Sequence, residues 1–409
     1  MNLNRPVWLD KQVLCLAIAE TIVWAGLFYL FPASLLQWNN HFGWELSEIS
    51  LALTISLIIS SLSGIASGKL VDAGAGKHLL SFSALLGGLV LVFLIAVESI
   101  WAFYAVWAIV GIAMGGCSYD PCFAVITRKY GNSAKAPIVM VTFFAGLAVT
   151  FCFLISSLVF SLSDWQANII VFSCLLCLIA APLFWFGSSN YMKSSKPSDL
   201  KSLTNSENYL KSILSKPIFW GLLILFSVFG LNHIMIMSQI LPLLESITVE
   251  GTLAVLVSAS MGIMQVSGRM SLVGFEKLAH RQLSTTKITL ACGIALSVAS
   301  VVLGYSGGNG LMILIFLVLQ GFSFGIINII KPVITAEKLG QSNFGVISSV
   351  VGVGYIWGFA FAPAISGYVF DAWGHGTLIL STFIIALAGS LIFAVSILWE
   401  SKKAKILSN

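Results

Sequence analysis

Four ionisable side chains lie inside apolar stretches of this chain, and their types suggest proton and anion chemistry. Glu20 and Asp120 carry carboxyl groups, Lys331 carries an amine, and His233 carries an imidazole. A charge at membrane depth costs roughly 2.5 to 3.5 kcal/mol on insertion scales, so each needs a reason to be there. Apolar surroundings favour the protonated form of a carboxyl group over the charged carboxylate. Such a group is suited to binding a proton and releasing it when its surroundings change. We take Glu20 and Asp120 as candidates for proton coupling, and Lys331 as a candidate for attracting an anion.

Each of these residues also has a structural interpretation. Lys331 lies near the end of its apolar stretch and can extend its amine toward the polar boundary. Asp120 can pair with Lys331 or Arg128 as a structural lock, and a histidine on an apolar face is more often a hydrogen-bonded structural residue. Glu20 is harder to explain in this way, because no basic residue lies within a turn or two of it in the sequence.

Polar and aromatic residues recur at helical spacing around these charges. Gln320, Phe324, Asn328 and Lys331 are separated by four, four and three positions, which places them on one stripe of a helix. A polar stripe on an apolar helix should face water or a partner, and aromatic walls with a few polar groups are typical of small-molecule sites. The predicted cavity residues are Trp24, Phe28, Tyr119, Asn232, His233, Gln239, Gln265, Gln320, Phe324, Asn328 and Lys331.

The elements that must position these residues are membrane-spanning helices. The 409 residues are 58% hydrophobic and only 9% charged, which excludes an ordinary soluble fold. Apolar runs of about 20 residues, the length that crosses a bilayer, recur along the whole chain. The predicted fold is an all-α membrane protein with twelve spans, at 12–38, 47–71, 79–97, 101–127, 134–161, 166–187, 217–245, 251–275, 286–304, 310–335, 341–370 and 376–398.

Charge distribution predicts the orientation of these spans. With a cytoplasmic amino terminus, all 21 Lys and Arg residues lie in cytoplasmic loops, in the termini or in the cytoplasmic third of a helix. This asymmetry follows the positive-inside rule and predicts that both termini are cytoplasmic, in a multi-pass protein of the cell inner membrane. The net charge of +5 is therefore explained by topology and gives no reason to expect a nucleic-acid partner.

The chain contains an internal repeat. At an offset near 209, Pro32 matches Pro242 and Pro121 matches Pro332. A Ser-, Lys- and Asn-rich stretch separates the two copies and has the composition of a linker. We therefore predict two pseudo-symmetric six-helix bundles, with a binding site near the bilayer midplane between the two halves. The predicted boundaries are 1–187 for the first bundle, 188–216 for a cytoplasmic linker and 217–409 for the second bundle.

Several other kinds of chemistry are disfavoured. Gly76 and Lys77 lack the preceding glycine and following Ser or Thr of a phosphate-binding loop, so direct use of ATP is not expected. All seven cysteines lie in apolar segments, and Cys174 and Cys177 have no accompanying histidine or carboxylate, so no metal site is predicted. An intramembrane enzyme would need paired catalytic groups, and His233 has no such cluster. We expect no enzymatic activity and no cofactor.

The loop after the second predicted span resembles a gating signature. It contains Gly68, Asp72 and Lys77 among further glycines, and this pattern is similar to the Gly, Asp and basic-residue motif of the major facilitator superfamily. The related loop of the second half keeps Gly268 and Arg269 but has Leu272 in place of the Asp. The resemblance implies that Asp72, with Arg128 as a possible partner, helps to close a cytoplasmic gate; the implied gate residues are Gly68, Asp72, Lys77, Arg128, Gly268 and Arg269.

The resemblance covers the whole chain except the linker and implies alternating access. It also implies that the first, fourth, seventh and tenth spans line the cavity. The segment around Trp44 resembles bacterial members grouped with organic-anion and monocarboxylate porters. The segment around Tyr119 resembles bacterial members whose substrate is uncertain. We expect a monomeric secondary transporter that takes up a small organic anion, such as a carboxylate or a siderophore-like metabolite, together with protons. The alternative is proton-driven efflux of a hydrophobic or cationic compound.

Overall fold

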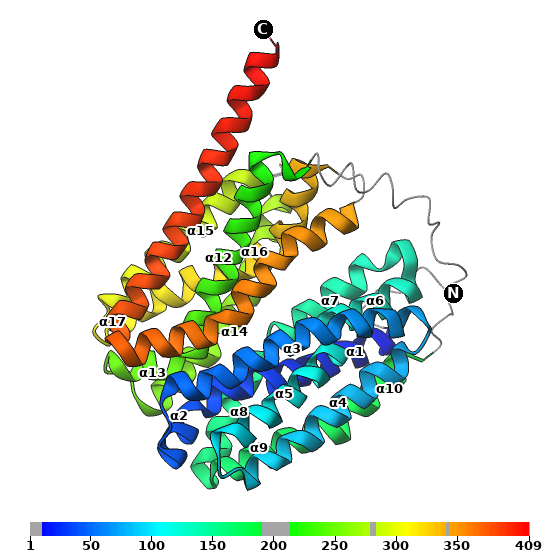
Figure 1. Cartoon of the computed structure of the whole chain (residues 1–409), viewed down its shortest axis with the longest axis vertical. Coiled ribbons are helices and arrows are strands. Elements are labelled where there is room, and N and C mark those ends of the chain that lie inside the picture. Colours follow the sequence, from blue (N-terminus) through cyan, green and yellow to red (C-terminus); the bar gives the residue numbers. More distant parts are fainter. Residues whose placement is uncertain (1–9, 190–212, 279–283, 341–343, 409) are drawn as a thin grey trace. The chain divides into compact units, whose positions relative to one another are not determined.

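The computed structural model describes residues 10–189, 213–278, 284–340 and 344–408, and these residues contain helices and no strands. The first half of the chain (Figure 1) forms α1 (Lys11–Val23), η2 (Trp24–Tyr29), α2 (Leu30–Phe42), α3 (Leu46–Asp72), α4 (Gly76–Val92), η3 (Phe93–Ala96), α5 (Ile100–Cys117), α6 (Tyr119–Tyr130), η4 (Gly131–Ser133), α7 (Lys135–Ala145), α8 (Ala148–Leu162), α9 (Trp165–Cys174), η5 (Leu175–Ala180) and α10 (Ala181–Gly187). The second half forms α12 (Pro217–Ser238), α13 (Ile240–Ser246), α14 (Gly251–Leu278), α15 (Thr285–Gly304), α16 (Gly310–Leu339) and α17 (Phe344–Ser408). The predicted linker lies largely in 190–212, outside the described residues.

The predicted membrane-length spans are confirmed. Eleven helical stretches of the described residues are long and apolar enough to cross a bilayer, and the last of them, Val350–Glu400, has 51 residues. Within that stretch Gly374 has φ 79° and ψ 174°, a conformation outside the helical region that only glycine adopts readily. Gly374 therefore divides α17 into two spans, which gives the twelve that hydropathy predicts. The orientation of the termini stays a prediction.

Prolines account for the interruptions of several spans. Proline has no N–H to donate to the carbonyl four residues earlier, and its ring collides with that carbonyl. Accordingly α5 ends at Cys117, four residues before Pro121, and α12 ends at Ser238, four residues before Pro242. In the first span Pro32 follows the π-helical segment Trp24–Tyr29, in which the Leu30 N–H bonds to the Ala25 carbonyl five residues back.

Two compact units make up the chain. The first contains 1–196, 239–242 and 250–263, and the second contains 197–238, 243–249 and 264–409. The predicted division into bundles at 187 and 217 stays a prediction.

Glycines allow close packing at matching places in the two halves. In the first unit, a Cβ atom at Gly111 of α5 would collide with the Ser56 carbonyl of α3. In the second unit, a Cβ atom at Gly321 or Gly325 of α16 would collide with α14. Gly111 and Gly321 are 210 positions apart, close to the repeat offset that the prolines give. Small residues let membrane helices approach each other in this way, so the repeat extends to helix packing.

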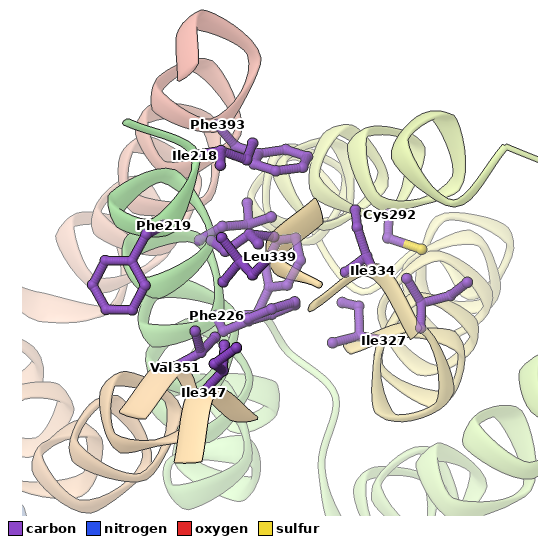
Figure 2. Packing of buried hydrophobic residues seen from close by; sticks show 14 of the residues in the cluster. Ile218, Phe219, Phe226, Cys292, Ile327, Ile334, Leu339, Ile347, Val351 and Phe393 are labelled. Carbon is purple, nitrogen blue, oxygen red and sulfur yellow. The ribbon is translucent and has the colours of Figure 1, made fainter. Parts of the chain in front are cut away.

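The second unit has a core of aliphatic and aromatic side chains (Figure 2). Figure 2 shows Phe393 of α17 beside Ile218 of α12, Ile334 of α16 beside Cys292 of α15, and Leu339 near the centre of the cluster. In the first unit large aromatic side chains fill the equivalent role, and Trp38 contacts Phe31 and Phe103 at ring-centroid distances of 5.3 and 5.2 Å. These cores fix the helices from which the candidate polar residues project.

Candidate functional site

Glu20 is the candidate proton carrier in the first unit. Its side chain is fully buried in α1. Neither carboxylate oxygen makes a hydrogen bond of regular geometry with a residue that the structure describes, although the Cys122 thiol and the Trp24 indole lie close enough to interact electrostatically with it. No Lys or Arg of the described residues forms an ion pair with Glu20. A buried carboxyl group without a basic partner is far more stable protonated than charged.

The backbone next to Glu20 is irregular. The π-helical segment η2 begins at Trp24, one turn after Glu20, and places Phe28 in contact with Trp24 at a ring-centroid distance of 5.6 Å. Such segments are rare in helices and occur often at functional sites. Glu20, Trp24 and Phe28 recur every four residues in the sequence, but this spacing does not predict the π-helical turn that begins at Trp24. The only available signal for that turn is Pro32, which disturbs the hydrogen bonding of the preceding turn.

Aromatic side chains connect this span to α6. Tyr119 lies 4.9 Å from Trp24 and stacks on Phe123 at 5.0 Å, measured between ring centroids. The predicted residues Trp24, Phe28 and Tyr119 therefore form one aromatic row within the first unit. Phe123 lies at the end of that row and was not among the predicted cavity residues.

Asp120 differs from Glu20 in its environment. It lies in the first turn of α6, where the helix dipole favours negative charge, and its side chain is exposed. It also interacts electrostatically with Glu20, so the two carboxyl groups influence each other. The thiols of Cys117 and Cys122 are buried in the same region. In the part of the chain that the structure describes, His, Cys, Asp and Glu side chains form no group of three that could hold a metal ion.

The second unit contains a buried polar network. Gln320 Nε2 donates to Asn232 Oδ1 at 3.1 Å, and Asn232 Nδ2 donates to the Thr382 carbonyl at 3.0 Å. The Thr382 hydroxyl continues the network to Ser300 Oγ at 3.0 Å. All four side chains are nearly or fully buried, so their partners matter for stability. Two of the predicted cavity residues, Gln320 and Asn232, are therefore hydrogen-bonded to each other. The sequence analysis did not identify Thr382 and Ser300, because single hydroxyl residues form no recognisable spacing pattern.

The His233 side chain, next to Asn232 in α12, has contacts of its own in the second unit. Its imidazole stacks on the Phe324 ring with centroids 3.4 Å apart, and its Nε2 lies 3.5 Å from Gln265 Nε2. The imidazole is fully buried, and its Nδ1 has no hydrogen-bond partner among the described residues. The structure therefore brings together His233, Gln265 and Phe324, which the sequence places on three different predicted spans.

Lys331 lies over an aromatic ring. Its ammonium is 3.9 Å from the centroid of Tyr355, and the Tyr355 hydroxyl lies 3.5 Å from Asn328 Oδ1. Asn328 in turn donates to the Phe324 carbonyl at 3.1 Å. A cation over an aromatic face keeps its charge while losing part of its water. Tyr355 was not among the predicted residues, although its ring contacts the Lys331 amine.

Gln239 belongs to the first unit. Its side chain is fully buried and its Nε2 donates to Ser50 Oγ at 2.8 Å, a contact within the first unit.

The residues implied as a cytoplasmic gate make different contacts, each within its own unit. Arg128 forms an ion pair with the Asp72 carboxylate, and its Nη1 also donates to the Asp72 carbonyl at 3.1 Å, so the partnership suggested by the sequence is present. Lys77 instead lies over Trp185 at 3.8 Å. A Cβ atom at Gly268 would lie 2.5 Å from the Phe322 carbonyl, so this glycine is required by helix packing, whereas Gly68 has open space around it. Arg269 is partly buried.

Comparisons with known proteins agree with this architecture. A family model described as the Major Facilitator Superfamily matches residues 16–284. Among solved structures, a mutant form of the nucleoside transporter NupG superposes with a TM-score of 0.76 at 12% identity, covering 94% of this chain and 98% of that one. A bacterial homologue of the human lysosomal transporter Spinster, inward-facing and occupied, gives 0.72 at 12% identity over 94% and 96%. A search of curated proteins finds no match.

Proposed function

The chain belongs to the major facilitator superfamily and is a transporter, and we propose that it moves a small organic anion across the cell inner membrane together with protons. The proposed mechanism is alternating access, in which a binding site opens to the two sides of the membrane in turn. A carboxylate or a siderophore-like metabolite is the proposed class of solute.

The observation that carries the proton coupling is the buried carboxyl group of Glu20. This group has no basic partner among the described residues, and it lies one turn before the π-helical segment that begins at Trp24. It also interacts electrostatically with Asp120. Taking up a proton removes a charge that the surrounding apolar side chains disfavour. Releasing the proton therefore requires a conformation that admits water to Glu20. This requirement links the protonation state to the conformation, which is the physical basis of symport.

Lys331 supports the anionic character of the proposed solute. Its amine is held by the face of Tyr355, which lowers the cost of removing water from the cation without cancelling its charge. An anionic group of a solute can then form a charge-assisted hydrogen bond with the amine. The nucleoside transporter and the Spinster homologue share only 12% identity with this chain, so their likeness supports the fold and leaves the solute class to be tested.

The experiment first finds a ligand and then measures its transport. The purified protein is screened by thermal shift against anionic, neutral and cationic metabolites at two pH values, because a ligand of the folded state raises its unfolding temperature. Ligands that stabilise the protein are then assayed for accumulation in proteoliposomes under an imposed pH gradient. We expect anions to stabilise the protein and to accumulate faster as the outside pH falls. Stabilisation by cations or hydrophobic compounds, with export against their gradient, would instead support efflux and overturn the proposal.

A substitution at Lys331 tests the anion site directly. Lys331→Gln should weaken binding of the anionic ligand by roughly tenfold to a hundredfold, because a hydrogen bond to a charged group contributes roughly 1.5 to 3 kcal/mol. The control is Lys338→Gln on the same helix, whose amine pairs with Glu337 at 3.4 Å. Equal affinities of the wild type and both variants for the anionic ligand would show that Lys331 does not contribute to the binding site.

A further inference from the structure

A basic and aromatic cluster lies at one end of α4 and α10, and it contains Lys77, the implied gate residue that contacts Trp185. The Lys77 ammonium, in the first turn of α4, lies 3.8 Å from the ring centroid of Trp185, near the end of α10. The His78 ring meets the same indole edge-on at 5.1 Å, and Phe82 lies 6.4 Å from it. Lys77, His78, Phe82 and Trp185 are called the α4–α10 cluster below. The two helices lie side by side in the first unit (Figure 1).

The Lys77 charge is not balanced by a carboxylate in the part of the chain that the structure describes, since no ion pair to Lys77 is formed there. Of the described residues, two nearby acidic groups have other partners: Asp72 pairs with Arg128, and Asp10 accepts a hydrogen bond from the Tyr130 hydroxyl at 2.6 Å. An amine held on a tryptophan at the end of a membrane span is therefore available to an outside anion.

An apolar stripe begins within the cluster, at Phe82, and continues along α4. Phe82, Leu86, Leu89 and Phe93 follow one another at spacings of four, three and four, so they share one face of the α4–η3 span. All four are exposed, at 58%, 37%, 54% and 64%. The neighbouring face of α4 is occupied, since the Ser173 hydroxyl and the Cys177 thiol both bond to its carbonyls. The stripe is thus a surface for hydrocarbon that runs away from the basic end.

We propose that the α4–α10 cluster and this stripe bind one phospholipid with an anionic head group. The Lys77 ammonium contacts the lipid phosphate, the Trp185 indole N–H and the His78 ring supply further polar contacts at the same depth, and an acyl chain lies along Phe82 to Phe93. Tryptophan is suited to this level of the bilayer because one side of its ring is apolar and the other carries a donor. A soluble phosphate would use only the head-group contacts, whereas the stripe requires an attached chain.

Lipid retention measures this site without knowledge of the transported solute. The full-length protein, purified in mild detergent, is incubated with equal amounts of phosphatidylglycerol and phosphatidylcholine, and native mass spectrometry counts each bound lipid. We expect the wild type to prefer phosphatidylglycerol, and Lys77→Gln to lower that preference by about fivefold, the effect of the roughly 1 kcal/mol that one basic residue contributes near an anionic surface. Trp185→Leu should lower it as well, because the ring that holds the amine is lost.

The matched control is Lys135→Gln, an exposed lysine at the start of another helix of the same unit. It should leave the preference for phosphatidylglycerol unchanged. Equal retention of the two lipids by the wild type would overturn the proposal, and so would equal losses in Lys77→Gln and Lys135→Gln, because general surface charge would then account for binding. If Lys77→Gln does not fold, the wild-type preference and Trp185→Leu decide the question.

Discussion

Glu20, Asp120 and Asp72 show how differently one chemical group can be used within the first unit. Glu20 is buried without a basic partner among the described residues, Asp120 is exposed at a helix start, and Asp72 is paired with Arg128. A protonation switch needs a charge whose cost changes with conformation, and Glu20 meets that condition best because its present surroundings strongly disfavour the carboxylate. An exposed or paired carboxylate changes less in energy when the conformation changes.

The Asp72–Arg128 pair gives a prediction about gating. We expect Asp72→Asn and Arg128→Gln each to slow transport, and the swapped double variant Asp72→Arg with Arg128→Asp to recover part of the rate. Because Asp72 is largely exposed, the pair should contribute no more than about 1 kcal/mol to the free energy of unfolding. Transport assays and thermal unfolding of the wild type and these variants separate the two effects. A double variant slower than both single variants would argue against a direct pairing role.

The buried network of the second unit gives a prediction about stability. Asn232→Leu keeps the approximate volume but removes the acceptor for Gln320 and the donor to the Thr382 carbonyl. Leaving those groups unsatisfied should lower the free energy of unfolding by about 1 to 3 kcal/mol. Unfolding of the purified protein measures this, with Ser260→Ala as the control because that hydroxyl bonds to a carbonyl of its own helix. An unchanged stability would mean that water replaces the lost partners.

At the scale of the helical elements, prolines can interrupt helices whereas glycines allow helices to pack closely. A proline ends or distorts a helix at the carbonyl four residues before it, as Cys117 and Pro121 illustrate. Pro332, which matches Pro121 in the repeat, leaves α16 continuous. The same residue at matching positions therefore breaks one helix and not the other. Glycines at Gly111 and Gly325 instead allow helices to touch at their backbones.

A pair of glycine substitutions tests the packing of α3 against α5. Gly111→Ala should destabilise the protein by about 1 to 3 kcal/mol, because the new methyl group collides with the Ser56 carbonyl. Gly64→Ala is the matched control, since Gly64 lies in helix α3 with no heavy atom within 4 Å of the added Cβ position. Alanine there should be neutral or stabilising by up to about 1 kcal/mol. Equal unfolding temperatures for the two variants would contradict this account of the helix contact.

At the scale of the whole molecule, the sequence predicts the architecture well because hydropathy and proline placement are local signals. The twelve spans follow from apolar length, and the loop around Asp72 indicates the family that the match over 16–284 establishes. Contacts between side chains that are far apart in the sequence cannot be predicted from such local signals. Helical spacing places Gln320 and Asn328 on one stripe, but it cannot say that Asn232 binds the first and Tyr355 lies beside the second.

The break at Ser118 shows the same limit for backbone geometry. The predicted span 101–127 treats this segment as one helix, whereas Ser118 is extended and α6 begins again at Tyr119. Pro121 is compatible with either outcome, as the unbroken α16 at Pro332 demonstrates. A proline alone therefore does not predict whether a helix breaks, and packing against other helices is not visible in a single sequence.

In the proposed mechanism Glu20 carries the coupled proton, and one pair of transport assays tests this role most directly. Proteoliposomes containing wild type or Glu20→Gln are given a ligand found by thermal shift, first under a pH gradient and then in solute exchange without a gradient. The wild type should accumulate ligand under the gradient and also exchange it. Glu20→Gln should keep exchange but lose gradient-driven accumulation, because a permanently neutral side chain has no proton to release. Full gradient-driven accumulation by Glu20→Gln would contradict the claim.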